Sequence, residues 1–560
     1  MTSKASMKIT LAQLNYTIGD FTGNVNKIKN CIKENTASDL IIFTELAISG
    51  YYPFDLLDCH DFLQSHQIAL DEIINYTKGF KPNILLGAIT ENPNSAGKKI
   101  YNSAILISNG KINFQYNKHL LPVYNIHDEA RHFEPGISSP FFSLNGKKYA
   151  VLICEDIWHT EQSYNQDNPI EQYLNVDLSG VFVLNASPSN IGKLAKRQDV
   201  VSYLAQKIKA PVAYINQVGG NEEIVFDGAS FIADEKGHLM SQAKIFEEDD
   251  LTLEFPIKSK VISEIKPPSY GLFLFEQLKL GLRDYIHKCG FKSIVVGCSG
   301  GIDSALVLAV AKYAIGAENI YAITMPSAFS SEGSVLDSVD LCRNLGIKLY
   351  TRPISDDFDL SCRHFEKSFG ESPSQLTKEN IQARIRGRVV MEFSNNYNAL
   401  TISTGNKSEM SVGYATLYGD MNGAINLLGD LYKQDVYLLS RYINQSHGEV
   451  IPLNIIDKEP SAELSEDQKD SDSLPPYDLL DPALKLYIEG DMLAADEIKL
   501  LEEKVNLLPQ KELSRLYRMV DFAEFKRKQA PPIIRVQRRS FGLGRQLPVA
   551  QKFTHYRSRK

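Results

Sequence analysis

Short apolar runs alternate with amphipathic segments along the chain, which is typical of a layered α/β protein. In the first 260 residues, runs that are apolar throughout or at every second position predict strands, and segments with apolar residues every three or four positions predict helices. The expected strands are 8–15, 40–43, 83–89, 103–108, 148–154, 181–185, 212–216 and 230–233, and the expected helices include 24–33, 61–76 and 193–208. Strands that alternate with helices and also occur in pairs favour a layered α/β domain.

The second half of the chain repeats a strand followed by a helix, which predicts a parallel sheet. Strands are expected at 293–297, 320–325, 348–352 and 399–403, with helical segments at 273–289 and 305–310 and another that ends near residue 345. Successive units of this kind build a sheet whose ligands bind at the carboxyl ends of its strands. We therefore expect a second α/β domain with a ligand site at that edge.

A polar segment with two adjacent prolines, residues 258–269, separates the two patterns. Such a composition is typical of a linker between domains. The chain has 560 residues, which exceeds the ~250–300 at which a single core usually divides. We expect a first domain at 7–257, the linker at 258–269 and a second domain at 270–560.

Composition and charge exclude several classes of protein. The chain is 43% hydrophobic and 23% charged, and its formal net charge of −8 argues against a general nucleic-acid binder. Seven cysteines without paired metal-ligand spacing indicate a reducing compartment, so we expect a cytoplasmic protein. The N-terminus lacks the apolar core of a secretion signal, and no segment reaches the ~18 apolar residues that span a bilayer. We expect no membrane partner.

A glycine-rich turn, named here the phosphate loop, links the expected strand at 293–297 to the next helix. Its residues are Gly297, Cys298, Ser299, Gly300, Gly301, Ile302, Asp303 and Ser304. Adjacent glycines let the backbone approach a ligand closely, and the start of the helix favours an anion. The loop lacks the lysine of the Walker loop of kinases and GTPases. Asp303 suits Mg²⁺ beside phosphates, although it could instead only cap the helix.

In the first half, three chemically useful side chains stand where a core would exclude polar groups. Glu45 follows an apolar strand, Lys118 lies in a short stretch before Leu121-Pro122, and Cys154 ends another apolar strand. A thiolate is a nucleophile, a carboxylate can take the thiol proton, and a lysine can stabilise the thiolate and a developing oxyanion. Each residue alone has an ordinary explanation as a buried thiol or a solvated charge.

Together, in the order Glu, Lys, Cys, these residues resemble the nitrilase superfamily of carbon–nitrogen hydrolases over about the first 260 residues. The matching motifs are Ala12-Gln-Leu-Asn15 with Gly19-Asp20, Phe43-Thr-Glu-Leu46, Lys118 with Leu121-Pro122, Phe133-Glu-Pro-Gly136, Cys154-Glu-Asp-Ile-Trp158 and Asn185-Ala-Ser187. The resemblance implies an αββα sandwich. It also implies that Cys154 is the nucleophile, Glu45 the general base and Lys118 the oxyanion stabiliser.

The same resemblance implies further residues around this triad. Glu129 matches a second carboxylate that supports the triad, although His127 stands where relatives often have phenylalanine before the Asp-Glu pair. Tyr124, Ser187 and Lys193 fall where relatives that use glutamine hold their substrate.

The phosphate loop resembles that of the N-type ATP pyrophosphatases, which cleave ATP to AMP and pyrophosphate while they adenylate an acceptor. From about residue 270 to 545, further segments resemble NAD synthetase. They are 380–388, Thr404-Gly-Asn-Lys-Ser-Glu409, Gly419-Asp420, Lys433, Lys458-Glu-Pro-Ser-Ala-Glu463, Leu474-Pro-Pro-Tyr-Asp478 and Glu524-Phe-Lys-Arg-Lys-Gln-Ala530. Because so many segments match in the same order along the chain, the resemblance is specific.

This second resemblance implies residue roles as well. ATP would be held by the phosphate loop with Thr404 and Lys433. Deamido-NAD would contact Asn380, Arg384, Glu409 and Lys526. Mg²⁺ would be bound by Asp303 and Glu409. Arg384 and Arg388 stand one helical turn apart, an arrangement that a solvated basic face would also explain.

Joined in one chain, the two resemblances imply ATP-dependent amidation of deamido-NAD to NAD. Ammonia would be released from glutamine through a thioester on Cys154, and the nicotinate carboxylate would be adenylated before ammonia displaces AMP. The other products are pyrophosphate and glutamate. We also expect an internal route for ammonia, and a homo-oligomer built on dimers of the synthetase domain, as the resemblance implies.

The residues of this chain disfavour four alternative functions. Asparagine synthetase needs an N-terminal cysteine, whereas this chain begins Met1-Thr2. GMP synthetase carries its cysteine in a Gly-x-Cys-x-Gly elbow, whereas Cys154 lies in Leu-Ile-Cys-Glu-Asp. A non-catalytic first domain is disfavoured by the catalytic trio, and a nucleotide sensor without turnover is disfavoured because Asp303 and Glu409 are both present.

Two charged segments remain. Residues 461–472 are acidic and poor in large apolar residues, so we expect a mobile lid or a disordered segment. Residues 535–560 contain eight Lys or Arg and no acid. Because no stacking module accompanies this basic tail, we expect it to contact an acidic neighbouring domain or subunit rather than nucleic acid.

Overall fold

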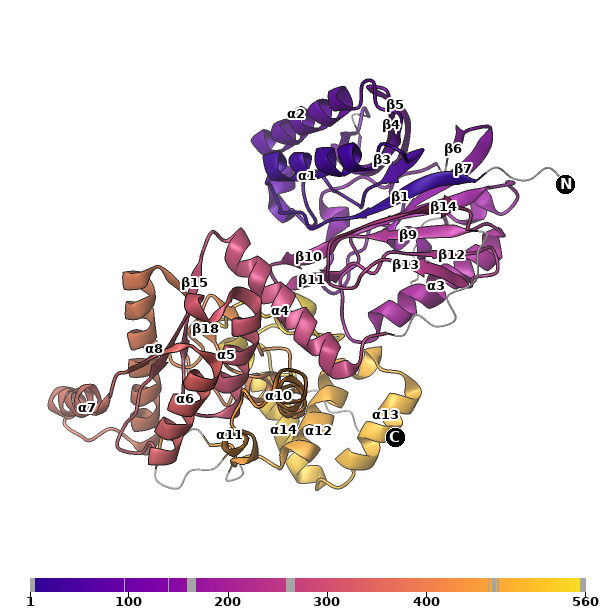
Figure 1. The fold of residues 1–560 in the computed structure, drawn as a ribbon. Helices are drawn as coiled ribbons and strands as arrows, with labels where there is room; N and C mark the ends of the chain where they lie inside the picture. The colour runs from indigo at the N-terminus through magenta and orange to yellow at the C-terminus, as the bar shows by residue number, and fades with distance from the viewer. Residues whose placement is uncertain are drawn as a thin grey trace. The chain divides into compact units, whose positions relative to one another are not determined.

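The computed structural model describes residues 6–94, 96–138, 140–158, 168–257, 267–461, 463–465, 470 and 473–553. The chain divides into two compact units, Met1–Pro267 and Pro268–Lys560. The first unit runs from indigo to magenta in Figure 1, and the second runs on to yellow. The expected linker and the acidic segment at 461–472 lie mostly outside the described residues.

The first unit is an αββα sandwich, as the resemblance implied. One six-stranded sheet has the order β14-β1-β2-β3-β4-β5, and the other has the order β13-β12-β9-β8-β7-β6. Helices α1 and α2 pack together on the first sheet, and α3 packs on β9 and β12 of the second (Figure 1). The bounds are β1 (Met7–Gln13), α1 (Phe21–Glu34), β2 (Leu40–Ile42), α2 (His60–Tyr76), β3 (Asn83–Glu91), β4 (Ile100–Ser108), β5 (Lys111–Asn117), β6 (Phe141–Leu144), β7 (Lys147–Ile153), β8 (Gly180–Asn185), α3 (Lys193–Ile208), β9 (Val212–Asn216), β12 (Phe231–Ala233), β13 (Leu239–Gln242) and β14 (Asp249–Phe255).

The alternation of side chains along β2 shows how the layers form. Leu40 and Ile42 belong to the core between the two sheets, together with Val183 of β8. Ile41 lies on the opposite face and packs with Ile28 of α1. Because successive strand residues point to opposite faces, an apolar strand of this kind serves both cores.

Short elements stand between the strands, and two of them carry candidate site residues: η2 (Glu129–Arg131) and η3 (Cys154–Ile157). The others are η1 (Phe54–Asp58), η4 (Glu171–Tyr173) and the hairpin of β10 (Val218–Asn221) and β11 (Ile224–Asp227). Glu45 follows the carboxyl end of β2, Lys118 follows β5, Cys154 follows β7 and Ser187 follows β8. The sheet topology therefore places residues from distant parts of the sequence at strand ends.

The second unit contains a five-stranded, all-parallel sheet with the order β17-β16-β15-β18-β19. From β15 the chain first adds β16 and β17 on one side, and then β18 and β19 on the other. The crevice outside the carboxyl ends of β15 and β18 is thus the switch point at which open α/β sheets bind ligands. The bounds are α4 (Tyr270–Lys288), β15 (Ser293–Gly297), α5 (Ile302–Ile315), η5 (Ala317–Asn319), β16 (Ile320–Thr324), α6 (Glu332–Leu345), β17 (Lys348–Thr351), α7 (Ser355–Phe369), α8 (Gln375–Tyr397), β18 (Ala399–Ser403), α9 (Lys407–Val412), β19 (Ile425–Asn426), α10 (Lys433–His447) and α11 (Leu453–Asp457).

Helices α12 (Tyr477–Glu489) and α14 (Gln510–Phe522) form an additional apolar cluster with α9. The C-terminal part of the chain, yellow in Figure 1, also contains η7 (Gly490–Met492), α13 (Ala495–Val505), α15 (Glu524–Arg527) and η8 (Gly542–Gly544). The described part of the basic tail pairs with acids of this same unit: Arg538 with Glu497, and Arg545 with Asp521 at 3.8 Å.

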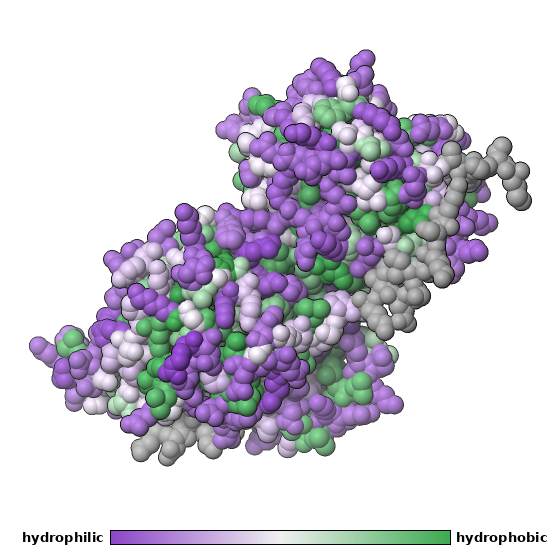
Figure 2. Space-filling model, viewed as in Figure 1, coloured by the Kyte–Doolittle hydropathy of each residue, from purple (hydrophilic) through white to green (hydrophobic). Residues whose placement is uncertain are grey.

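Several expected elements are confirmed almost to the residue, including the helix at 193–208 and the strands of the parallel sheet. Strand β14 and helix α7 were not predicted. No helix of the described residues is long and apolar enough to cross a membrane. On the visible face, hydrophilic residues cover most of the surface and hydrophobic areas are smaller (Figure 2).

Candidate active sites

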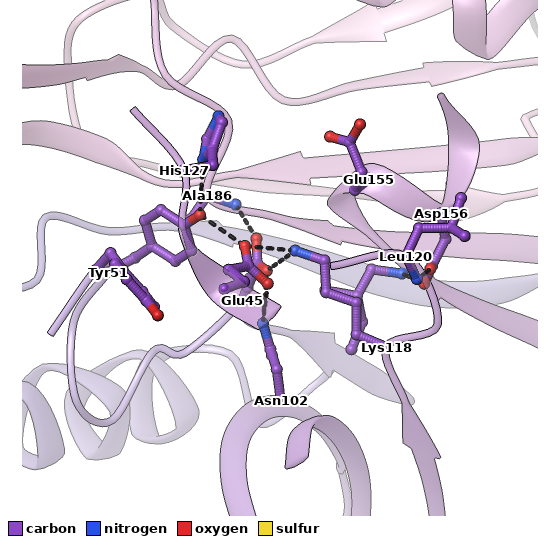
Figure 3. Close-up of polar contacts among 12 residues, drawn as sticks. Glu45, Tyr51, Asn102, Lys118, Leu120, His127, Glu155, Asp156 and Ala186 are labelled. Carbon is purple, nitrogen blue, oxygen red and sulfur yellow. Dashed lines mark hydrogen bonds and ion pairs between the residues drawn. The ribbon is translucent and has the colours of Figure 1, made fainter. Parts of the chain in front are cut away.

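A buried cluster of charged side chains lies at the strand ends of the first unit. Glu45 and Lys118 are 0% and 1% exposed, and Cys154 is 8% exposed. The Nζ of Lys118 donates to Oε1 of Glu45 at 2.7 Å (Figure 3). It also donates to Oε1 of Glu129 at 2.8 Å. The sequence-predicted Cys154, Glu45, Lys118 and Glu129 are thus brought together, because the thiol of Cys154 interacts electrostatically with the other three.

Hydrogen bonds fix the general-base candidate Glu45 from two sides. The backbone N–H of Ala186 donates to its Oε2 at 2.9 Å, and Nδ2 of Asn102 donates to its Oε1 at 2.8 Å. On the second carboxylate, the Tyr51 hydroxyl donates to Oε1 of Glu129 at 2.7 Å. These donors hold both carboxylates toward Lys118, and Figure 3 shows Asn102 and Ala186 on either side of Glu45.

The pKa values of the cluster reflect the competition between burial and charge pairing. Burial raises the pKa of Cys154, Glu45 raises it further and Lys118 opposes them, so the resting thiol holds its proton. Burial likewise raises the pKa of Glu129 to about 7, although Lys118 lowers it. For Lys118, burial lowers the pKa, but Glu129 and Glu45 outweigh burial and raise it. The ammonium is therefore the stable form of Lys118.

The backbone at Cys154 is held in an unusual conformation, with φ of +42° directly after β7. A non-glycine residue in this region is strained, and such strain is often found at reactive positions. Two residues on, the buried carboxylate of Asp156 accepts from the N–H groups of His119 and Leu120 at 3.0 and 2.9 Å, and from Ile153 N–H at 2.9 Å. Asp156 thereby ties the strand end that carries Cys154 to the segment that carries Lys118.

Of the glutamine-binding candidates Lys193, Ser187 and Tyr124, Lys193 interacts electrostatically with Cys154. Lys193 at the start of α3 places its Nζ 3.7 Å from the centre of the Trp158 ring, and burial, with help from Arg197, lowers the pKa of Lys193 to about 8. Ser187 is buried, and its hydroxyl accepts from Nε of Arg197 at 3.1 Å. The Tyr124 hydroxyl donates to Oε1 of Glu155 at 2.8 Å.

Glu155 is a residue that the sequence analysis left without a role. It is 4% exposed, it directly follows the nucleophile, and its charge acts on both Cys154 and Lys193. A carboxylate next to a cysteine at a strand end was the signal that could have identified it.

In the second unit, a cavity of about 310 Å³ lies at the switch point of the sheet. The phosphate loop lines it, with the exception of Gly300, and so do Thr404, Glu409 and Lys433. Gly300 has φ of +78°, and a Cβ there would stand 2.2 Å from the carbonyl oxygen of Ser334. A glycine is therefore required at this position, because only glycine combines this φ with so close a neighbour.

Opposite charges meet at the inner end of this cavity. The Nζ of Lys433, at the start of α10, donates to Oδ2 of Asp303 at 2.6 Å and to Oε1 of Glu409 at 3.2 Å. Burial raises the pKa of Glu409 to about 8, Lys433 lowers it and Asp303 raises it again. Two carboxylates that converge on one ammonium form a site rich in hard oxygen donors, and this chemistry fits Mg²⁺.

The remaining candidates for deamido-NAD lie beside the cavity rather than in its lining. Asn380 accepts from the hydroxyl of Thr416, which does line the cavity, at 2.9 Å. Lys526 donates to the carbonyl oxygens of Gly413 and Ala415, each at 2.7 Å. Arg384 is exposed and donates to the carbonyl oxygen of Leu417 at 3.2 Å.

Two cationic side chains of the cavity were not assigned from sequence. Arg386 lies on the inward face of α8, and burial lowers its pKa to about 10. Lys458 contacts the hydroxyl of Ser334 and lies 3.4 Å from Glu463. Both cations line a cavity beside the phosphate loop, where an anionic ligand would meet them.

Comparisons with known proteins agree with this division. A family model described as carbon-nitrogen hydrolase matches residues 8–266, and one described as NAD synthase matches 274–530. The glutamine-dependent NAD(+) synthetase of Synechocystis sp. is 38% identical over 97% of this chain and 99% of its own length. That of Thermotoga maritima is 36% identical over 98% and 99%.

Solved structures give the same result. The glutamine-dependent NAD+ synthetase of Acinetobacter baumannii, in complex with ADP, aligns with a TM-score of 0.76 and 35% identity over 97% of this chain and 98% of that one. With full-length relatives of this similarity and both family models matched, the chain belongs to the glutamine-dependent NAD(+) synthetase family.

Proposed function

We propose that this protein converts deamido-NAD to NAD, with glutamine as the nitrogen donor and ATP as the co-substrate. The observation that carries the proposal is the presence of two complete sites in one chain. A buried Cys-Lys-Glu cluster suited to amide hydrolysis occupies one unit, and a cavity with a phosphate loop occupies the other. Family membership supports this reaction for both units.

In the first unit, Cys154 attacks the carboxamide carbon of glutamine. Because burial keeps the thiol protonated at rest, Glu45 must take the proton as Sγ bonds to carbon. The ammonium of Lys118 faces the charge that develops on the carbonyl oxygen. Glu45 returns the proton to the leaving nitrogen, ammonia departs and a thioester remains. Water, deprotonated by Glu45, then hydrolyses the thioester to glutamate.

Glutamine is a zwitterion, and the residues around Cys154 match both of its charges. Lys193 can pair with the α-carboxylate, while Glu155 can pair with the α-ammonium. Tyr124 orients Glu155 through its hydroxyl at 2.8 Å. Ser187 lies beside them with its hydroxyl held by Arg197. This assignment makes the four residues determinants of glutamine binding.

In the second unit, the phosphate loop holds ATP so that the nicotinate carboxylate of deamido-NAD can attack the α-phosphorus. Pyrophosphate leaves and an adenylate forms; ammonia then attacks the activated carboxyl carbon and displaces AMP. The ADP bound by the Acinetobacter baumannii relative supports a nucleotide in this cavity. Lys433 and Arg386 supply positive charge at the cavity wall, and Thr404 contributes a hydroxyl at the end of β18.

Asp303 and Glu409 are the residues that would hold Mg²⁺, which when bound neutralises phosphate charge. We assign deamido-NAD to the rim formed by Asn380, Arg384 and Lys526 near Thr416, with Glu409 at its inner edge. Lys526 acts there mainly by fixing the 413–415 backbone, to which it donates two hydrogen bonds.

Further parts of the proposal concern the whole protein. A homo-oligomer built on synthetase dimers, an internal route for ammonia and a cytoplasmic location follow from the family resemblance and from seven free cysteines. Light scattering after gel filtration tests the oligomer: a monomer at all working concentrations would contradict it.

The decisive experiment supplies deamido-NAD, ATP and Mg²⁺ with either glutamine or ammonium. Wild type should make NAD from both donors. Cys154→Ala should make NAD only from ammonium, because the second unit does not need the thiol. Loss of both activities in a folded Cys154→Ala variant would overturn the division of labour, and so would normal use of glutamine.

A further inference from the structure

A group of metal-ligating side chains lies in the first unit and takes no part in the mechanism above. Asp55 and Asp58 stand at the exposed face of η1, and His132 follows η2. One ligand atom from each of the three lies within 4.8 Å of the other two. Exposed acids alone do not indicate a metal, so the state of His132 decides the argument.

The ring of His132 is buried, with its side chain 2% exposed, and its Nε2 has no hydrogen-bond partner among the described residues. Its Nδ1 lies 2.7 Å from the hydroxyl oxygen of Tyr52, which donates its own proton to the carbonyl oxygen of Asp128 at 3.1 Å. When the single hydroxyl proton of Tyr52 goes to Asp128, the hydroxyl oxygen accepts from Nδ1–H of His132. In that tautomer the lone pair of the ring is on Nε2.

This lone pair is directed toward the two carboxylates. Nε2 lies 3.4 Å from Oδ1 of Asp55 and 3.6 Å from Oδ2 of Asp58. A lone pair facing carboxylate oxygens is repulsive unless a cation lies between them. Two ligands that each stand about 2.0–2.1 Å from a tetrahedral ion are about 3.4 Å apart, so the spacing matches such a site.

A competing cation is present on one side only. Nη2 of Arg131 lies 3.1 Å from Oδ1 of Asp55, but the Arg131 side chain is 55% exposed and can turn to solvent. Asp58 has no such partner in the described ion pairs beyond His132. An ion between His132 and the two acids therefore requires only that the Arg131 side chain rotate away.

We propose that His132, Asp55 and Asp58 bind one divalent transition ion of the Zn²⁺ class, with water at the open position. An imidazole ligand favours such an ion over Mg²⁺ or Ca²⁺, which prefer oxygen ligands alone. The Tyr52 hydroxyl on Nδ1 is the outer partner that fixes the ring of a metal-bound histidine. The ion would clamp η1 to η2, whose first residue is Glu129, and so brace the glutaminase site without entering it.

The test uses the full-length protein, freed of metal by a chelator under reducing conditions. Zn²⁺ is added alone in a calorimetric titration, and Co²⁺ is added as a spectroscopic probe, because its absorption distinguishes thiolate ligands from nitrogen and oxygen. The key variant is Asp55→Asn with Asp58→Asn, which alters exposed side chains only. Asp71→Asn on α2 is the matched control, and Cys59→Ser removes the adjacent exposed thiol.

Wild type should bind one equivalent of Zn²⁺, with a cobalt spectrum free of thiolate character, and its thermal unfolding temperature should rise with Zn²⁺. The double variant should bind at least about tenfold more weakly and lose the thermal shift, whereas Asp71→Asn and Cys59→Ser should match wild type. Equal binding by wild type and the double variant would overturn the site. So would a thiolate cobalt spectrum, or no binding at all.

Discussion

Lys118 and Glu45 form an ion pair that is closed to solvent: Nζ lies 2.7 Å from Oε1, and both side chains are 0% exposed. The same ammonium lies 2.8 Å from Glu129, so one cation serves two carboxylates. In a buried cluster, removal of one member leaves a charge without compensation. The three residues therefore act as one unit in stability.

Glu129→Gln should change how stability depends on pH. The carboxyl of Glu129 has a pKa raised from 4.5 to about 7 by burial, so the folded protein binds this proton more tightly than the unfolded chain. The stabilisation from the proton is complete below pH 4.5 and is lost as pH rises through 7, by at most about 1.4 kcal/mol per pH unit. Glutamine cannot titrate, so this loss should be absent in the variant.

Urea unfolding of the first unit, followed between about pH 5 and pH 8, measures this difference. In wild type, the pH profile of glutaminase activity should show a step near pH 7 from the same ionisation. This step should be absent in Glu129→Gln. Parallel stability curves for wild type and variant would show that Glu129 is not the titrating member of the cluster.

Asp156→Asn should lower glutaminase turnover although Asp156 is outside the triad. Its carboxylate joins the 119–120 backbone to Ile153, and an amide cannot accept all of these hydrogen bonds. We expect a loss of about 2–4 kcal/mol in unfolding free energy and a fall in kcat with little change in KM for glutamine. The exposed Asp199→Asn on α3 is the control. If kcat and the unfolding free energy of Asp156→Asn both equal those of wild type, Asp156 does not position the site.

That Glu45 and Cys154 lie close together could be predicted because both come after apolar strands. Cys154 directly follows β7, Glu45 stands three residues after β2, and their local motifs carry the family resemblance. Asp156 could not be predicted in the same way. Its function depends on three backbone N–H groups, two of which belong to a segment more than 30 residues away, and backbone donors leave no pattern in the sequence.

The arginines of α8 show a second limit of prediction from the sequence. The spacing of Arg384 and Arg388 places them on one face, and the structure confirms that both are exposed, with Arg388 paired to Asp357 at 2.8 Å. Arg386 is the one that lines the cavity. Periodicity gives the relative angle between side chains on a helix, but only packing of α8 against β15 and β18 decides which face meets the ligand.

Lys193→Met should weaken glutamine binding and spare the synthetase reaction. If Lys193 pairs with the α-carboxylate, its loss should raise KM for glutamine by at least about tenfold. Because burial lowers the pKa of Lys193 to about 8, kcat/KM for wild type should fall as pH rises above 8, where the charge is lost. Lys196→Met is the matched control, since Lys196 lies 5.9 Å from the same Trp158 ring.

Ammonium-dependent NAD synthesis provides the second readout for these lysine variants. It should be equal in wild type, Lys193→Met and Lys196→Met, because the second unit does not use glutamine. A normal KM for glutamine in Lys193→Met would show that another residue binds the α-carboxylate.

Gly300→Ala should abolish adenylation while glutamine hydrolysis persists. Two separate effects act at this position: the φ of +78° disfavours alanine, and its Cβ would stand 2.2 Å from the Ser334 carbonyl oxygen. Gly290→Ala isolates the first effect, since Gly290 has φ of +79° and no heavy atom within 4 Å of the added Cβ.

We expect Gly290→Ala to lower the unfolding free energy by about 1–2 kcal/mol and to keep ammonium-dependent NAD synthesis. Gly300→Ala should lose that activity at least about 100-fold, because the phosphate loop must move away from Ser334. Calorimetric ATP titration of both variants measures whether the nucleotide still binds, and equal ATP affinity in the two would show that the loop tolerates the displacement.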